Sequence, residues 1–197
     1  MMLGALCQIL TRILTRVLFF FRPTVPAVSL EAHCIRRSAE AYTHPDFIEI
    51  KIFLEIYPKV GSTLPDPDQG SFLLPPDCSD AELGSTLQKG IAAYRVIPTE
   101  LSAEMHQRFR NEDWHGQWIA ERMAQFGYKR KGQLFKRLHL CFIEEMDGII
   151  TISPSWHDRP DGWTVVDTSN DIHIPMDSPP EAIGAALRLG FSRCWGR

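Results

Sequence analysis

The sequence lacks the short motifs that hold nucleotides, catalytic nucleophiles or structural zinc. It contains no GxGxxG segment, Walker loop, GxSxG elbow or HExxH pair, so nothing supports a dinucleotide-binding enzyme, a P-loop NTPase, an α/β-hydrolase or a zinc protease. The five cysteines are scattered and none forms a CxxC pair. This argues against a disulfide framework and a zinc site, and it favours a reducing cytoplasm. We expect no cofactor and no metal.

Long apolar runs are also scarce, and the one candidate lies within residues 1–21. Arg12 and Arg16 interrupt it, whereas a membrane-spanning helix needs about 20 mostly apolar residues in a row. A signal peptide would carry its positive charge before the apolar region and end at a small-residue cleavage site, and neither is present. A helix lying on a membrane surface and an upstream extension remain as interpretations. We treat 1–30 as an apolar N-terminal extension and expect one domain over 35–197, without a stable membrane span.

Two segments one hundred residues apart, Leu74–Tyr94 and Ile174–Cys194, have the same pattern. In each, the end of a predicted strand leads through Pro, Asp and Ser into an apolar helix. Gly84 and Gly184 occupy matched positions beside the apolar stripe of that helix. Because glycine costs a helix about 1 kcal/mol relative to alanine, this match indicates close approach of another backbone. Chance similarity between two capped helices is the alternative; we favour a duplicated strand–helix unit.

Each copy carries its own signals for the start of the helix. Ser79 with Glu82, and Ser178 with Glu181, have the spacing of a capping box, and Pro179 would occupy the first helical position. One stripe of each helix is apolar and is expected to be buried. The stripe residues are Leu83, Leu87, Ile91 and Tyr94 in the first copy, and Ile183, Leu187, Phe191 and Cys194 in the second.

Strand signals occur before each copy. Residues 47–56 alternate well enough to predict a strand whose Glu49 and Lys51 lie on or near the solvent side. Asp147-Gly148 is the dipeptide of a type I′ turn and predicts a β-hairpin. The residues that share the buried face of this hairpin are Cys141, Ile143, Ile150 and Ile152.

The middle of the chain, between the first copy and the hairpin, is predicted to be helical from Glu112 onward. Glu112 and Asp113 open a segment with one apolar face, Gly127 closes it, and a second short helix is expected over 133–138. The expected class is α+β. We predict a single domain built from two similar strand–helix halves around a mixed or antiparallel sheet, with the helical segment between them.

Charge is segregated along the chain. Residues 61–88 contain acids but no Lys or Arg, and residues 144–187 hold nine acids against the single Arg159. Residues 108–138 are the reverse, with eight bases against three acids. A solvated surface explains part of this pattern. Because the acidic stretches surround the repeated units, a partner with a basic surface would be steered toward them.

Two other function classes stay open on the residues alone. The first is a small cytoplasmic hydrolase or transferase that uses His157 with neighbouring acids, although closeness in sequence to Ser153 and Asp158 does not make a catalytic relay. A metal site at His157, Asp158 and Asp161 belongs to the same class. The second is an RNA-binding module through the basic run 128–137, which the acidic remainder of the chain opposes.

Three stretches carry a resemblance to a known family. The run FGYKRKGQLFKRLHLCFIEEMDGIITISPSWHDRPDGW, followed by IPMDSPPEAIGAALRLGFSRCW, resembles the C-terminal half of the CdiI family of contact-dependent growth inhibition immunity proteins. LPPDCSDAELGSTLQKGIAAYR is similar to the helix segment of the family's N-terminal half. The resemblance covers about residues 35 to 195. Ala182 and the pair Gly190-Phe191 depart from the family pattern, which bears on packing more than on role.

The resemblance implies a cytoplasmic bacterial protein that binds the C-terminal toxin domain of a CdiA exoprotein and blocks its active site without being an enzyme. Toxins paired with such proteins include RNA-cleaving nucleases, and tRNA is a possible target. A nuclease must approach phosphates and is therefore expected to be basic, so an acidic inhibitor surface would complement it. Direct binding of nucleic acid by this chain is not expected.

The family transfers no residue-level site, because toxin-binding surfaces must differ between cognate pairs. From charge and aromatic character we expect exposed acids and tryptophan anchors to contact the toxin. For each single residue, a solvated loop acid or a packed tryptophan is the simpler interpretation. The expected toxin-binding residues are Asp66, Asp68, Trp156, Asp158, Asp161 and Trp163.

Overall fold

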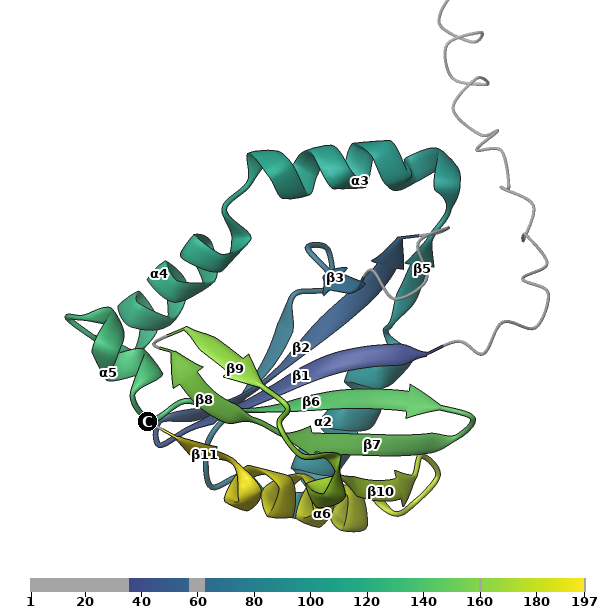
Figure 1. The fold of residues 1–197 in the computed structure, drawn as a ribbon, viewed down its shortest axis with the longest axis vertical. Helices are drawn as coiled ribbons and strands as arrows, with labels where there is room; N and C mark the ends of the chain where they lie inside the picture. Colours follow the sequence, from purple (N-terminus) through teal and green to yellow (C-terminus); the bar gives the residue numbers. More distant parts are fainter. Residues whose placement is uncertain (1–35, 57–62, 160, 197) are drawn as a thin grey trace, which may run out of the picture. The chain divides into compact units, whose positions relative to one another are not determined.

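The structure is a computed structural model that describes residues 36–56, 63–159 and 161–196 (Figure 1). These residues belong to one compact unit, Cys34–Arg197. The prediction of an apolar extension over 1–30 lies outside the described residues. No helix in the described ranges is long and apolar enough to cross a membrane.

The strands form two sheets. The larger has eight strands in the order β10-β7-β6-β1-β2-β3, and β4 and β5 also pair with β2. All its pairs are antiparallel except the parallel pair of β5 with β2. The smaller sheet has the order β11-β8-β9. The strands are β1 Arg37–His44, β2 Phe47–Ile56, β3 Thr63–Pro65, β4 Ser71–Leu74, β5 Arg95–Ile97, β6 His139–Met146, β7 Ile149–Pro154, β8 Trp156–Arg159, β9 Gly162–Thr164, β10 Ile172–Pro175 and β11 Trp195–Gly196.

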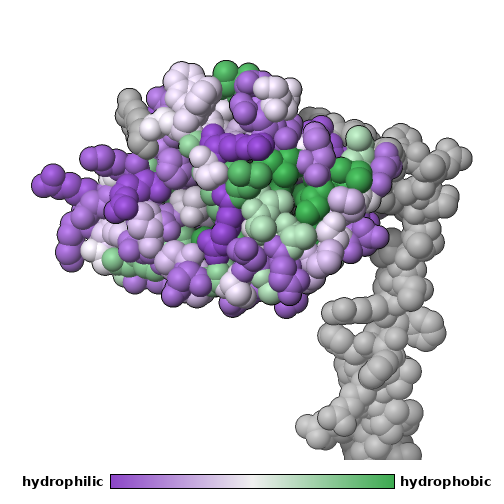
Figure 2. Space-filling model, turned by 90° about the horizontal axis from the view of Figure 1, so that it is seen from below, coloured by the Kyte–Doolittle hydropathy of each residue, from purple (hydrophilic) through white to green (hydrophobic). Residues whose placement is uncertain are grey.

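Helices lie on both sides of the large sheet (Figure 1). They are α2 Asp80–Ala92, α3 Thr99–Asn111, α4 Trp114–Phe126, α5 Lys131–Phe135 and α6 Pro180–Arg193, with the 3₁₀ helix η1 at Thr168–Asn170. Helices α2 and α6 pack together against one face, and α4 and α5 contribute to an aromatic cluster on the other. Seen from the side of α2 and α6, the surface is mainly hydrophilic with a hydrophobic area near its middle (Figure 2). The α+β prediction is confirmed.

The two predicted halves are present and are larger than the repeat visible in the sequence. Hairpin β1–β2 with β4 and α2 has the same arrangement as hairpin β6–β7 with β10 and α6. The halves meet along β1 and β6, where Ala39 pairs with Ile143 and Ala41 pairs with Cys141. The first strands of the two hairpins are thus antiparallel neighbours at the middle of the sheet.

The matched glycines allow α2 and α6 to cross at close range. A Cβ atom on Gly84 would overlap the carbonyl group of Pro180, and one on Gly184 would overlap that of Asp80. The sequence prediction of close backbone approach is confirmed. The helices can therefore seal the main core, whose Leu83, Leu87, Ile183 and Leu187 side chains are fully buried.

The predicted capping differs between the copies. Ser79 is the N-cap of α2, and its Oγ accepts a hydrogen bond of 3.1 Å from the backbone N–H of Glu82. The second prediction is wrong, because α6 begins at Pro180 with Pro179 as its N-cap and no side-chain cap. The residue before a proline is held in an extended conformation, so Pro179 cannot enter the helix and Ser178 lies outside it.

The predicted hairpin and middle helix are confirmed. Asp147 and Gly148 both have positive φ, at 53° and 79°, as a type I′ turn requires. Asp113 caps α4 by accepting a hydrogen bond from the N–H of Gly116, and Gly127 ends the helix in the left-handed conformation. The short helix expected over 133–138 is α5, which begins and ends earlier. Helix α3 has no counterpart in the prediction.

Candidate functional site

The face of the sheet opposite α2 and α6 forms the floor of a cleft. Because alternate side chains of a strand point to opposite faces, Ala39 and Ala41 lie in the main core while Glu40 and Tyr42 line the cleft. Strand β2 contributes Glu49 and Lys51 in the same way, and α3 and α4 supply the facing wall. The cleft encloses about 790 Å³.

The lining combines carboxylates with aromatic rings. Among the described residues, seven acids and two bases line the cleft, namely Glu40, Glu49, Asp66, Glu112, Asp113, Glu121 and Asp161 against Lys51 and Arg122. Its aromatic residues are Tyr42, Phe53, Phe109, Trp114, His115, Trp118, Phe142 and Trp163. The excess of acids gives the cleft a negative character, so it can attract a cation and pack against that cation's apolar stem.

Lys51 shows how the floor holds a cation. Its Nζ atom lies 3.6 Å from the ring centroid of Trp118 and 4.6 Å from that of Tyr42. Burial lowers the pKa of Lys51, and the charges of Glu40 and Glu49 oppose that change. Burial raises the pKa of Glu40, although a hydrogen bond of 2.7 Å from the Tyr42 hydroxyl favours its charged form.

A buried ion pair fixes α4 to the sheet beside Lys51. The guanidinium of Arg122 donates to both carboxylate oxygens of Glu49, at 2.9 and 2.7 Å, and the Trp118 indole donates to the same carboxylate at 2.9 Å. Burial alone would raise the pKa of Glu49, but hydrogen bonds from Arg122 and Ser71 outweigh it and lower the pKa. The sequence interpretation placed Glu49 toward solvent and is wrong, because α4 covers this part of the face and leaves Glu49 0% exposed.

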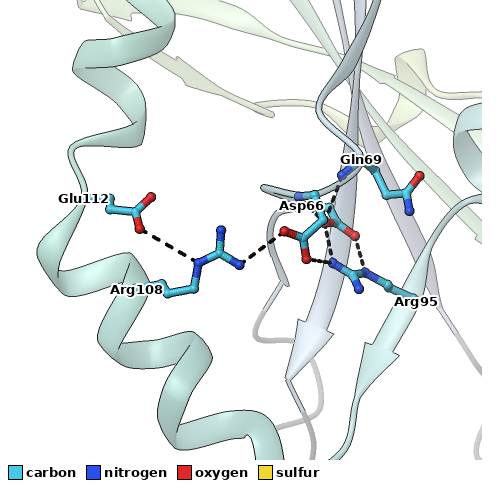
Figure 3. Close-up of polar contacts among 6 residues, drawn as sticks. Asp66, Gln69, Arg95, Arg108 and Glu112 are labelled. Carbon is cyan, nitrogen blue, oxygen red and sulfur yellow. Dashed lines mark hydrogen bonds and ion pairs between the residues drawn. The ribbon is translucent and has the colours of Figure 1, made fainter. Parts of the chain in front are cut away.

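Asp66 organises a turn at the rim of the cleft (Figure 3). Its side chain is fully buried and accepts hydrogen bonds from the backbone N–H groups of Asp68 and Gln69. The Arg95 guanidinium lies against the Asp66 carboxylate and also reaches Asp68 at 2.6 Å. Asp66 is therefore occupied within the protein and is placed to support the rim.

Asp68 connects this turn to α3. Its carboxylate receives Arg95 on one side and Arg108 of α3, at 3.2 Å, on the other. Arg108 also lies 3.8 Å from Glu112. The Asp68 side chain is 47% exposed, so this carboxylate both positions α3 and faces solvent.

The other four expected toxin-binding residues fall into two groups. Asp161, which is exposed, and Trp163 line the cleft together with Asp66. Trp156 lies on the smaller sheet, 42% exposed, with its ring edge against Trp195 at a centroid distance of 6.5 Å. Asp158 is largely covered and lies 3.5 Å from Arg159. The structure thus brings Asp66, Asp161 and Trp163 to one cavity and leaves Trp156 and Asp158 outside it.

His157, the residue considered for catalysis or metal binding, is buried and packs against an aromatic ring. His157 is 2% exposed and stacks on Trp163 with a centroid distance of 4.8 Å. Within the described ranges, no three His, Cys, Asp or Glu side chains are grouped to hold a metal ion. The geometry therefore favours a role for His157 in holding Trp163 at the cleft.

Several residues that line the cleft were not predicted as site residues from the sequence, chiefly Lys51, Trp118 and Arg122. Two sequence patterns could have indicated these residues. One is the row of polar side chains on one face of the strand over 47–56, and the other is the aromatic stripe of the helix after Asp113. Taken alone, each pattern fits side chains that face solvent as well as side chains that are buried. Their apposition depends on the position of α4 over β2, which local patterns do not specify.

Comparison with known proteins identifies the family. The model of the family described as CDI immunity protein matches residues 37–194. The immunity protein CdiI-YPIII of Yersinia pseudotuberculosis serotype O:3 (strain YPIII) is 31% identical over 159 residues, covering 74% of this chain and 90% of that protein.

Two solved structures share the fold. A protein of unknown function from Neisseria meningitidis has a TM-score of 0.68 and 26% identity, covering 83% of this chain and 98% of that one. A chain of the CdiA-CT/CdiI toxin and immunity complex from Yersinia pseudotuberculosis has a TM-score of 0.68 and 27% identity, covering 82% and 98%. The chain therefore belongs to the CDI immunity protein family.

Proposed function

We propose that this protein binds the C-terminal toxin domain of its cognate CdiA exoprotein in the cytoplasm and neutralises it without catalysing a reaction. The observation that carries the proposal is the likeness to one chain of a toxin and immunity complex, of which 98% is covered. The family match, which covers residues 37–194, also supports it.

The proposed target is a nuclease domain, with tRNA as one possible substrate. A nuclease surface that holds phosphates is basic, and an acidic inhibitor can cover it or occupy its phosphate site. The residues proposed to face the toxin are the acids Asp68, Asp158 and Asp161 with the tryptophans Trp156 and Trp163, while Asp66 supports the rim. The exposure of Asp68, Asp161 and Trp156 is consistent with this role.

Inhibition is proposed to be steric and electrostatic, which makes it stoichiometric. We expect co-expression with the toxin domain encoded immediately upstream to restore growth, and the purified proteins to elute as one complex from a sizing column. Inhibition of purified toxin should be complete at about one immunity protein per toxin. No protection together with no complex would contradict the proposal.

The same assay separates the other function classes. A hydrolase or transferase acting on the toxin would inhibit far below equimolar amounts, and activity would depend on His157. A His157→Gln variant that is folded and still protects would exclude this use of His157. RNA binding that is strong at low salt and falls steeply as salt rises would instead favour the module at Lys129, Arg130 and Lys131.

A further inference from the structure

We propose that the cleft between the β1–β2 face and helices α3 and α4 receives an arginine- or lysine-bearing segment of the toxin domain. This inference rests on the proposed function and specifies where the toxin binds and which of its side chains enters. The cleft is defined by Glu40, Tyr42, Lys51, Trp114, Trp118 and Asp161, among others.

The size of the cleft admits a side chain together with part of its backbone. Its volume of about 790 Å³ falls in the range of sites that enclose most of a small ligand, about 300–1,000 Å³. Its wall on the α4 side carries Trp114, which is half-buried, and Gln117, which is exposed. The cleft can therefore be reached from solvent along α4.

The charge of the lining selects a cation. Arg122 neutralises Glu49 through two hydrogen bonds, and Lys51 lies over the Trp118 ring, where the charges of Glu40 and Glu49 favour its charged form. The seven acids of the lining therefore exceed the charge of its two bases. The exposed acids Glu121 and Asp161 at its edge face an entering group, and they would attract an incoming guanidinium or ammonium.

The aromatic rings favour the long stem of Arg or Lys over a small ion. The flat guanidinium of arginine stacks on aromatic faces, and the stems of both residues pack on apolar surface. The Trp118 ring already contacts a cation within the protein, because Lys51 Nζ lies 3.6 Å from its centroid. An RNA base could stack on the same rings, but its phosphates would meet the acids, so a basic protein segment is the better occupant.

The test uses the full chain and its cognate toxin domain, with affinity measured by calorimetry. A Glu121→Lys/Asp161→Lys variant reverses two acids of the cleft, and we expect toxin affinity to fall on the order of a hundredfold. The matched control is Asp77→Lys/Asp177→Lys, which reverses two exposed acids at repeat positions outside the cleft lining. The control should stay within about threefold of the parent.

A second pair of variants tests whether filling the cleft with a large side chain, without changing its charge, weakens toxin binding. Gln117→Trp fills the cleft from an exposed position of α4, and Gln107→Trp adds the same side chain on an exposed position of α3 outside the lining. We expect only the first to weaken toxin binding, by about tenfold or more. Thermal unfolding of all four variants checks that each is folded.

The outcomes separate this inference from the proposed function. If the parent protein binds toxin and the cleft variants bind equally well, the toxin docks elsewhere and only the cleft inference is overturned. If the parent fails to bind toxin, both are overturned. If a fluorescent single-stranded RNA binds the parent and Gln117→Trp abolishes that binding while toxin affinity is unchanged, the cleft is an RNA site.

Discussion

At the scale of single residues, the buried pair of Glu49 and Arg122 decides how the cleft is built. The carboxylate is 0% exposed and the Arg122 residue 9% exposed, and Trp118 and Ser71 supply further hydrogen bonds to the carboxylate. A buried pair costs desolvation, so its presence is weak evidence for a gain in stability. Its clear consequence is geometric, since the pair fixes α4 at one position above β2.

Breaking this pair from one side should destabilise the protein strongly. In Glu49→Ala the Arg122 charge stays buried without its carboxylate, and we expect the free energy of unfolding to fall by about 3–5 kcal/mol in urea titration. Glu121→Ala is the matched control, because Glu121 approaches the same guanidinium at 3.9 Å from a 68% exposed side chain. Its effect should not exceed about 1 kcal/mol. Equal losses in both variants would contradict the account.

The Glu49 carboxylate makes the stability of the protein depend on pH, and the direction of its pKa shift gives the sign of that dependence. The pKa of Glu49 is lowered from its ordinary 4.5 in the folded state, so its contribution to stability is fully present above about pH 4.5 and is lost as the pH falls through the lowered value. The stability difference between the parent and Glu49→Gln should therefore be constant near neutrality and shrink below pH 4.5. Urea titrations at a series of pH values measure this difference. A difference that grows on acidification would show the opposite linkage.

Neutralising the two neighbouring acids at the rim, Asp66 and Asp68, should lower the free energy of unfolding by different amounts. Asp66 is fully buried and accepts backbone hydrogen bonds, whereas Asp68 is 47% exposed. We expect Asp66→Asn to lower the free energy of unfolding by more than about 2 kcal/mol, and Asp68→Asn by no more than about 1 kcal/mol. Chemical denaturation compares the two variants. Similar losses would mean that Asp66 is not the organiser of the turn.

At the scale of elements, the close crossing of α2 and α6 depends on glycine. Gly84→Ala places a methyl group on the Pro180 carbonyl, so we expect destabilisation by about 3 kcal/mol although alanine is the better helix former. Gly132→Ala in α5 is the control, since nothing lies within 4 Å of the added carbon. It should be neutral or stabilising by up to about 1 kcal/mol. Thermal unfolding distinguishes the two, and a neutral Gly84→Ala would show that the helices can separate without cost.

Elements with strong local signals were predictable, and those fixed by distant contacts were not. Asp147-Gly148 specifies its turn by backbone conformation alone, and Asp113 with Gly127 delimits α4 by capping chemistry. Helix α3 was missed because its sequence is mainly polar and only Met105 is buried in it. Its place depends on contacts with residues distant in the chain, because Met105 packs with Leu54 and Ile97 and Arg108 pairs with Asp68, 40 residues away.

At the scale of the whole molecule, the two halves provide the large sheet with its α2–α6 layer, and the insertion between them provides further helices. The segment from α3 to α5 lies between the first half and the second in sequence, and its helices α3 and α4 wall the cleft. The halves could be read from the repeated helix pattern. The cleft could not, because it combines β1, β2, α3, α4 and the turn before β9, whose side chains meet only after the sheet has formed.

The charge distribution of the whole molecule predicts how it would meet the basic toxin domain proposed above. Exposed carboxylates accelerate encounter over distances that salt screens, with a Debye length of about 10 Å at 0.1 M. Raising salt from about 0.05 to 0.5 M should slow association with the toxin by tenfold or more and change dissociation less, as measured by stopped-flow fluorescence. Glu121→Lys/Asp161→Lys should flatten this dependence more than Asp77→Lys/Asp177→Lys does. If the two variants respond alike, net charge steers the encounter; if the parent is insensitive to salt, steering is absent and affinity must come from the aromatic contacts alone.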